Sequence, residues 1–355
     1  MSIKNRAFFL TASKQLEMRE IPIPKIGPKE VLVRMGAIGV CGSDVHYYSH
    51  GRIGDFVVEY PFILGHECAG TVVETGAEVT KLHVGDRVAL EPGISCGTCE
   101  MCRTGHYNLC PDVIFLATPP YNGCLMEYIA YPENYAFKLP DNMTLEQGAL
   151  VEPMAIGVNA VLTGKVKAGD SVLIIGAGCI GLVTMFAAKS SGASTIIVSD
   201  IIKLRLDTAL KLGASHTVDS RGDIVSEVMK ITNGRGVDVV LDCAGFSSTV
   251  KLSMQLVRPN GRVVIVGMGE DQLNDIPLGL LSTKEVEITS IFRYKNLYPT
   301  TISLIAGGLA DINGIVTKRF TFEQTAEAYS SAYENPSETV KNIIIFEKAE
   351  EKVGA

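Results

Sequence analysis

The sequence lacks any long hydrophobic run and any block of basic residues. In its 355 residues no stretch of about 18 apolar side chains predicts a membrane-spanning helix, and the first 15 residues lack the apolar core of a signal peptide. Lys and Arg are scattered and the formal net charge is -7, which disfavours binding to nucleic acid or an anionic membrane. We therefore expect a cytoplasmic protein whose partner is a small molecule.

The chain also lacks internal repeats, low-complexity tracts and a flexible Gly/Ser linker. Its length suits about two domains, and a hydrophobic content of 46% is enough to fill their cores. Disorder is therefore excluded, and we expect the two domains to pack closely.

Two kinds of patterning divide the chain. Up to about residue 140, short β-branched runs alternate with Gly and Pro, which predicts a folded antiparallel β region. From about residue 155, buried strands such as "SVLIIGAG" and "STIIVSD" alternate with helical segments, which predicts parallel βαβ units. We expect "RVVIVGMG" to be an interior strand and "VKNIIIFEK" to contain the last strand.

A glycine-rich turn follows the strand in "SVLIIGAGCIGL". Gly176, Gly178 and Gly181 have the GxGxxG spacing that allows a tight turn, close approach of a pyrophosphate and close helix packing. Asp200 ends the next strand, where its carboxylate would accept ribose hydroxyls and repel a 2'-phosphate. This favours NAD over NADP, although Arg205 nearby could weaken the preference. The alternative is a flavodoxin-like turn that binds no dinucleotide.

Four cysteines lie close together in "CGTCEMCRTGHYNLC". Cys96, Cys99, Cys102 and Cys110 could close around one Zn²⁺, which would make a structural site in a lobe spanning about residues 92–112. An iron–sulfur cluster uses similar spacings, and a chance group of thiols is a further alternative. The other four cysteines outside the candidate sites are expected to be small buried residues: Cys68, Cys124, Cys179 and Cys243.

A second metal site needs ligands that leave one coordination position open. Cys41 in "GVCGSD", His66 and Glu67 in "LGHECAG", and Glu152 in "LVEPM" are the candidates. Each of them taken alone is more readily explained as a core or turn residue. Their occurrence beside a dinucleotide turn and a Cys₄ lobe favours a catalytic metal.

Over nearly its whole length the sequence resembles the zinc-dependent medium-chain dehydrogenases, and among them the sorbitol (L-iditol) and related polyol dehydrogenases. The resemblance rests on ordered matches, in particular "CGSDVHYYSHGRIGDF", "LGHE", "GDRVALEPG", "ALVEP", "GAGCIGL", "VGMG" and "IFRYKN". It implies an α/β protein with a GroES-like, partly open β-barrel catalytic domain (1–155 and 291–355) and a Rossmann doubly wound parallel-sheet domain (156–290). It also implies a homotetramer or homodimer.

The resemblance assigns roles to individual residues. It implies that Cys41, His66 and Glu67 hold the catalytic zinc, with Glu152 either a direct ligand or linked through water. Ser43 and His46 match a proton relay, and the residues expected to bind the polyol are Tyr47, Glu152, Arg293 and Tyr294. Beyond the glycine turn, the expected cofactor contacts are Ile180, Asp200, Arg205, Val266, Met268, Ile291 and Arg293.

The function predicted from the sequence is reversible transfer of a hydride from a secondary hydroxyl of a sugar alcohol to NAD, which yields a ketose. Sorbitol, xylitol, L-iditol and galactitol are the substrates considered. The alternative on the same scaffold is an alcohol, butanediol or threonine dehydrogenase. A non-catalytic dinucleotide-binding protein is disfavoured, because such a protein has no need for an open zinc position.

Overall fold

The computed structural model describes residues 4–270 and 272–346, and the chain forms two compact units. Of the described residues, the first unit comprises 4–103, 110–152 and 316–346. The second unit comprises residues 104–109 and 153–315. Segments from before and after the parallel-sheet region therefore contribute to the first unit, and the parallel-sheet region is inserted between them in the sequence.

The first unit consists mainly of strands. Its strands are β1 (Asn5–Ala12), β2 (Gln15–Ile21), β3 (Glu30–Gly39), β4 (Arg52–Ile53), β5 (Phe56–Val57), β6 (Glu67–Thr75), β7 (Arg87–Leu90), β8 (Gly93–Ile94), β9 (Ile114–Phe115), β10 (Tyr128–Pro132), β11 (Ala136–Lys138), β18 (Val316–Thr321) and β19 (Lys341–Ile345). Its helices are α1 (Gly42–His50), α2 (Glu100–Arg103), α3 (Leu145–Ala149) and α11 (Thr325–Glu334), with 3₁₀ turns η2 (Glu133–Tyr135) and η4 (Phe322–Gln324).

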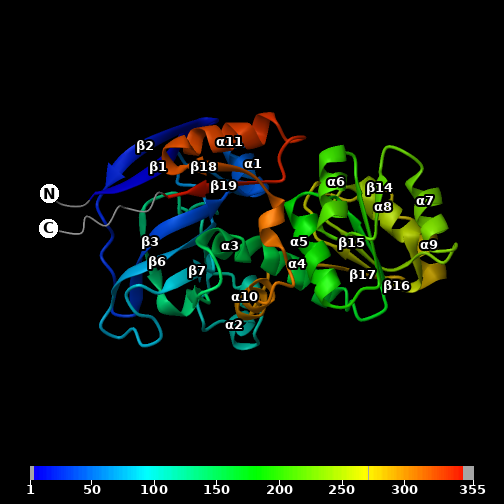
Figure 1. Ribbon diagram of the computed structural model, residues 1–355, viewed down its shortest axis with the longest axis horizontal. Coiled ribbons are helices and arrows are strands. Elements are labelled where there is room, and N and C mark those ends of the chain that lie inside the picture. Colours follow the sequence, from blue (N-terminus) through cyan, green and yellow to red (C-terminus); the bar gives the residue numbers. More distant parts are fainter. Residues whose placement is uncertain (1–3, 271, 347–355) are drawn as a thin grey trace. The chain divides into compact units, whose positions relative to one another are not determined.

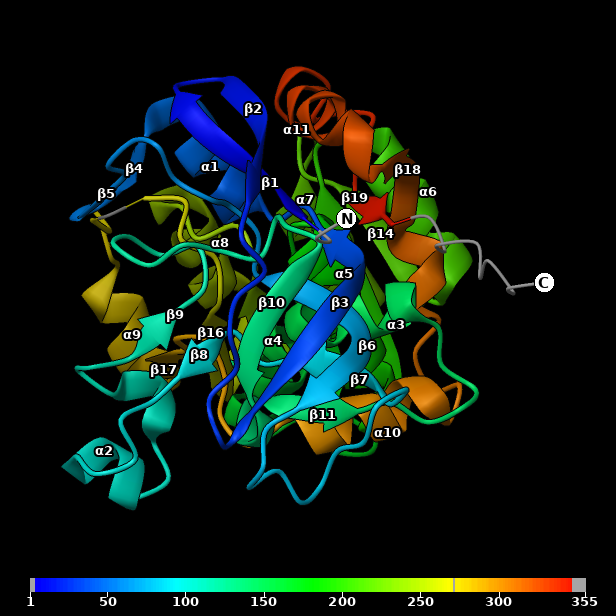
Figure 2. The same ribbon diagram turned by 90° about the vertical axis from the view of Figure 1, so that its left-hand side faces the viewer.

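The main sheet of this unit brings distant segments together. Its strand order is β11-β7-β6-β3-β19-β18, with β10 also paired to β3. Figure 2 shows β3, β6, β7 and β11 side by side. The end of β3 at Gly39 is opposite Glu67 of β6 on one side and Ile343 of β19 on the other. The expected last strand is confirmed, and it lies next to the strand that leads into the "GVCGSD" stretch.

The second unit alternates strands and helices. Its strands are β12 (Ser171–Ile175), β13 (Thr195–Asp200), β14 (His216–Asp219), β15 (Val237–Asp242), β16 (Val257–Ile265) and β17 (Glu287–Ser290). Its helices are α4 (Val151–Thr163), which begins in the first unit, α5 (Cys179–Ser190), α6 (Lys203–Leu212), α7 (Ile224–Ile231), α8 (Ser247–Leu256), α9 (Leu278–Lys284) and α10 (Tyr298–Ala306), with η1 (Tyr107–Leu109) and η3 (Ile312–Ile315).

The six strands form one parallel sheet in the order β14-β13-β12-β15-β16-β17, with helices around it (Figure 1). All six residues of β15 are buried, because a central parallel strand is covered on both faces. Strand β16 has a neighbour on each side, so the expected interior position of "RVVIVGMG" is confirmed. The strand order reverses at β12, where doubly wound sheets bind their ligands.

The segment 291–315 differs from the expected domain division. The resemblance implies that residues 291–315 belong to the catalytic domain, whereas contacts place them in the second unit. The reason is that η3 packs on α5 and α6, and the Asn159 amide donates to the carbonyl of Arg293 at 2.8 Å. Among the described helices, none has both the length and the apolar character needed to cross a membrane.

Candidate active site and metal centres

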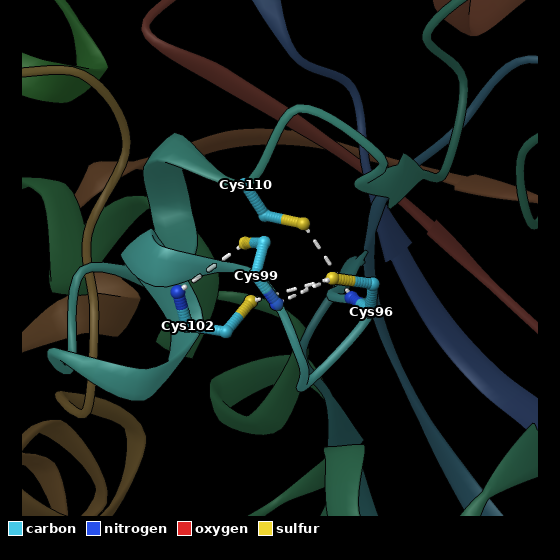
Figure 3. Close-up of side chains that lie close together, drawn as sticks. All are labelled: Cys96, Cys99, Cys102 and Cys110. Atoms are coloured by element: carbon cyan, nitrogen blue, oxygen red, sulfur yellow. Dashed lines mark hydrogen bonds between the residues drawn. The ribbon is translucent and has the colours of Figure 1, made fainter.

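The four cysteines of the lobe converge in the structure. Their Sγ atoms lie within 4.8 Å of one another, and Figure 3 shows the four side chains gathered in one cluster. Cys96 Sγ and Cys102 Sγ are 3.9 Å apart, close to the edge of about 3.8 Å in a tetrahedron of 2.3 Å Zn–S bonds. The donor set fits a zinc ion whose four positions are all occupied by protein.

Backbone groups of the lobe support the thiolate form. The N–H of Cys99 donates to Cys96 Sγ and that of Cys102 donates to Cys99 Sγ, both at 3.4 Å. Hydrogen bonds from the backbone of Thr98 and Cys99 lower the pKa of the Cys96 thiol to about 6. Because metals bind the thiolate, these hydrogen bonds prepare Cys96 for a cation, whereas at Cys99 the hydrogen bond from the Cys102 backbone is outweighed by desolvation and the surrounding thiols, which raise the pKa to about 12 in the metal-free lobe.

A second, mixed group of ligand atoms forms at the end of the main sheet. Cys41 is the residue before α1, and His66 and Glu67 stand where β6 begins. One ligand atom from each of the three residues lies within 4.8 Å of the others, and His66 and Glu67 are buried. Sulfur, nitrogen and oxygen donors of this kind suit Zn²⁺, and three protein ligands leave a fourth position for a small molecule.

His66 is oriented by a carboxylate that sequence reasoning did not single out. Asp44 on α1, fully buried, places Oδ2 3.3 Å from Nδ1 of His66, which leaves Nε2 for a metal. Burial acts to lower the pKa of His66, but Asp44 and Cys41 outweigh it, so the pKa is raised well above the ordinary value. In the metal-free chain a proton and a metal therefore compete for this ring.

Glu67 has a partner from the other end of the chain. Both of its carboxylate oxygens accept hydrogen bonds from Nζ of Lys341 at 2.8 Å, and the two side chains are 1% and 2% exposed. Lys341 also donates to the carbonyl of Val40 at 3.1 Å. The two residues are 274 positions apart, so no local motif could have revealed this pair.

Glu152 is not a member of the three-residue group at this distance. It is buried in the first turn of α4, on a different element from the other three. The structure therefore brings together three of the four residues expected at the catalytic zinc, and the part played by Glu152 stays a prediction.

Helix α1 carries the residues expected to move a proton and to contact substrate. Ser43 Oγ donates to Cys41 Sγ at 3.3 Å, which places this hydroxyl beside the metal ligands. His46 is exposed one turn later, and its ring stacks on His50 with centroids 4.5 Å apart. Tyr47 is buried on the same helix.

The glycine turn of the second unit has the geometry expected for a dinucleotide. Gly176 has φ +92°, a conformation that L side chains rarely adopt. A Cβ at Gly181 would stand 1.8 Å from the carbonyl oxygen of Gly176, whereas a Cβ at Gly178 would meet only Arg205, at 3.9 Å. The turn is therefore closed toward helix α5 and open where a pyrophosphate would approach.

Asp200 lies at the end of β13, as expected, and is 7% exposed. Its Oδ2 accepts from the N–H of Ala177 at 2.7 Å and its Oδ1 accepts from Ile202 at 2.8 Å. Arg205 places a guanidinium nitrogen 3.9 Å from Oδ2. The carboxylate thus holds the glycine turn while keeping further lone pairs for a ligand hydroxyl.

The other expected cofactor residues follow the carboxyl ends of neighbouring strands. The N–H of Val266 donates to the carbonyl of Asp242 at 2.8 Å, Ile291 donates to Ile265, and Met268 is 77% exposed. Ile180 lies in the first turn of α5. Asp242, which we did not single out from the sequence, accepts from Ala244 and Gly245 and fixes the second turn of this edge.

Arg293 and Tyr294 belong to the second unit. Arg293 has φ +55° and its guanidinium lies over the ring of Phe292, 4.7 Å from the centroid. Tyr294 is 3% exposed and packs against Tyr298. Their role toward the substrate stays a prediction.

Two family models match the chain. Residues 27–141 match the alcohol dehydrogenase GroES-like domain, and residues 179–307 match the zinc-binding dehydrogenase domain. The first covers the segments that bear both cysteine-containing sites, and the second begins within the glycine turn.

Curated relatives match the chain over most of its length. The chain is 43% identical to a sorbitol dehydrogenase of Bacillus subtilis (strain 168), with 96% of each chain covered. It is also 43% identical to an L-idonate 5-dehydrogenase of Vitis vinifera, over 90% of this chain and 89% of that protein. Among solved structures, the 2R,3R-butanediol dehydrogenase of Bacillus subtilis superposes with a TM-score of 0.88 at 32% identity, covering 96% and 99% of the two chains.

These matches agree with the geometry. The three-ligand group and the closed Cys₄ lobe lie within the first matched segment, and the second matched segment begins at residue 179, inside the glycine turn. The chain therefore belongs to the zinc-binding, medium-chain alcohol dehydrogenase family, in its sorbitol dehydrogenase branch.

Proposed function

We propose that this protein oxidises a secondary hydroxyl of a sugar alcohol to a ketone with NAD, reversibly, at a zinc ion held by Cys41, His66 and Glu67. The observation that carries the proposal is the convergence of three unlike ligand atoms at a site separate from the closed Cys₄ lobe. A bound zinc would act there as a Lewis acid that lowers the pKa of a substrate hydroxyl. The sorbitol dehydrogenase relatives support a polyol as substrate.

The residues of α1 would move the proton that such a reaction releases. Ser43 Oγ lies beside Cys41, and His46 is three residues further along the same helix, where side chains are neighbours. The imidazole of His46 is exposed, where a side chain that can both accept and donate a proton reaches solvent. Tyr47, Glu152, Arg293 and Tyr294 are proposed to bind the remaining substrate hydroxyls, with Glu152 also a candidate metal contact.

For the cofactor, we propose NAD on the open side of the turn from Gly176 to Gly181, with Asp200 accepting the ribose hydroxyls. The proposal is supported by the space at Gly178 and by the buried carboxylate at the end of β13. Ile180, Arg205, Val266, Met268, Ile291 and Arg293 are the further proposed contacts.

Initial rates test the proposal. The purified chain is assayed with sorbitol, xylitol, L-iditol, galactitol, butanediol and threonine, each with NAD and with NADP. We expect the highest kcat/KM for a polyol with NAD. The second candidate, a butanediol dehydrogenase, is favoured by the structural neighbour that acts on that diol, and activity confined to butanediol would replace the polyol proposal.

Two finer properties are also proposed. A cytoplasmic location is supported by all nine cysteines being free of disulfides. Assembly as a homotetramer or homodimer follows from the family, and analytical ultracentrifugation of the purified chain measures it.

A further inference from the structure

We propose that Lys341 is a positioning residue of the metal site, which draws charge from Glu67 and thereby holds the affinity of the site for its metal below what the three ligands alone would give. The inference rests on the proposed function, because it takes Cys41, His66 and Glu67 as the ligands. It concerns a residue outside that set, on the last strand of the sheet.

The register of three adjacent strands creates the pair. Glu67 begins β6, Gly39 ends β3 opposite it, and Lys341 begins β19 on the far side of β3. A Cβ at Gly39 would stand 2.1 Å from Oε2 of Glu67. Only a glycine here leaves room for the carboxylate and the ammonium group to meet across the end of β3.

The pair is buried and the ammonium group holds both oxygens. Nζ of Lys341 is 2.8 Å from Oε1 and 2.8 Å from Oε2, and it is further fixed by the carbonyl of Val40. A carboxylate whose two oxygens both accept from a cation is a weaker donor to a metal, because the same lone pairs and negative charge serve both. The ammonium group also repels a divalent ion at short range in a site that water does not screen.

Both effects predict the direction in which metal affinity changes when Lys341 is replaced. If Lys341 restrains Glu67, removal of the positive charge must strengthen metal binding, because Glu67 can then turn both oxygens to the metal. If Lys341 only supports the fold, its removal leaves metal binding unchanged or weakens it by displacing Glu67. The sign of the change in affinity therefore separates the two explanations.

The test measures metal affinity in the full-length chain. Zinc is titrated against a chelator such as dipicolinic acid, and the equivalent that disappears in Cys41→Ser is taken as the site in question. We expect Lys341→Met to lower the Kd for zinc at this site by about tenfold, a change as large as the smaller losses seen when groups next to ligands are replaced, but of opposite sign. Lys341→Arg, which keeps the charge, should restore the Kd of the unmodified chain.

Cobalt(II) supplies a second readout that does not depend on activity. If Glu67 binds the metal through both oxygens in Lys341→Met, the coordination number rises and the visible d–d absorption of the bound cobalt weakens. Lys341→Arg should keep the original intensity. An unchanged or higher zinc Kd in Lys341→Met would overturn the inference, and an unchanged cobalt spectrum would agree with that outcome.

Two further variants guard against misfolding. Lys284, in the second unit, donates to the carbonyls of Met254, Gln255 and Val257, so Lys284→Met removes a comparable lysine without touching the site. We expect it to leave the zinc Kd unchanged. If Lys341→Met does not fold, the double variant Glu67→Gln/Lys341→Met, which leaves no charge unpaired, replaces it. It should bind zinc more tightly than Glu67→Gln alone, and equal or weaker binding refutes the inference.

The outcome also separates the inference from the proposed function. If the unmodified chain holds no metal equivalent that Cys41→Ser removes, the proposed catalytic site is wrong. If that equivalent is present but Lys341→Met does not tighten it, the site stands and only the role of Lys341 fails.

Discussion

The two metal sites of the first unit are built in opposite ways. The Cys₄ lobe takes all its ligands from residues 96–110, with backbone N–H groups of the same loop bonded to sulfur. The group of Cys41, His66 and Glu67 is assembled from the ends of β3 and β6 and is supported by Asp44 and Lys341. The first site is formed by one short loop, whereas the second depends on the register of strands that are far apart in the sequence.

The strongest test of this contrast is Cys41→Ala. Loss of this ligand should reduce turnover about a thousandfold or more, because a Lewis acid contributes several kcal/mol to such a reaction. Zinc in the lobe and binding of NADH, measured by fluorescence, should survive. Retained oxidation of polyols would show that the metal is not needed for the reaction.

Cys102→Ser tests the other site of the comparison, the Cys₄ lobe. We expect the loss of one zinc per chain by elemental analysis and a fall in the thermal unfolding midpoint by about 5–10 °C, as expected for a loss of a few kcal/mol. Turnover per folded chain should fall far less than in Cys41→Ala. A variant that kept its stability but lost all turnover would contradict the division into structural and catalytic sites.

The second unit also contains a buried carboxylate whose hydrogen-bond partners come from different segments of the chain. Asp238 on β15 accepts hydrogen bonds from Arg235, Arg258 and Ser171, with its side chain 10% exposed. Burial works against its charge, but these partners prevail and hold its pKa well below the ordinary value. Stability from this group is therefore complete above about pH 4 and is lost as the pH falls toward the folded-state pKa.

We expect Asp238→Asn to lose about 1–3 kcal/mol of unfolding free energy at pH 7, from broken charge-assisted hydrogen bonds. The gap to the unmodified chain should narrow below about pH 4, where the native carboxylate also begins to lose its advantage. Urea unfolding at pH 7, 4 and 3 measures both. The control is Asp219→Asn: among the described residues the exposed Asp219 side chain forms its ion pair with Arg221, which is also exposed, and the stability of this variant should stay close to that of the unmodified chain.

The smallest expected effect concerns the glycine turn, the most local feature of that unit. Asp200→Ala should raise the KM for NAD about tenfold and narrow the preference for NAD over NADP, because a charged hydrogen-bond acceptor is lost. Asp207→Ala, an exposed neighbour paired with Lys203, is the matched control and should change neither value. An unchanged NAD/NADP ratio in Asp200→Ala would place cofactor choice elsewhere.

Local patterns explain what the sequence could reveal. The strand, turn and helix around Gly176 and the spacing of Cys96 to Cys110 are short-range features, and the structure reproduces both. Cys41, His66 and Glu67 could be proposed because each stands at the end of a recognisable strand or in a family motif. Their convergence required the sheet, since β3 and β6 pair across a long connection.

The residues that support the metal ligands could not be assigned from the sequence alone, for the same physical reason. Lys341 stands in an otherwise ordinary strand pattern, and only the antiparallel pairing of β19 with β3 brings it to Glu67. The placement of residues 291–315 in the second unit likewise depends on packing of η3 against α5 and α6, which no periodicity encodes. Asp44 was within a quoted motif, and its position three residues after Cys41 on α1 was the available signal.

The position of Lys341 on β19 bears on the order in which the metal site is assembled while the chain is being synthesised. Strands β3 and β6 emerge from the ribosome early, so Cys41, His66 and Glu67 can meet long before translation reaches residue 341. During that interval Glu67 lacks Lys341, the ammonium group that holds both of its oxygens in the folded chain. If Lys341 restrains Glu67 as proposed, the docking of β19 is the step of folding that sets the final affinity of the site for its metal.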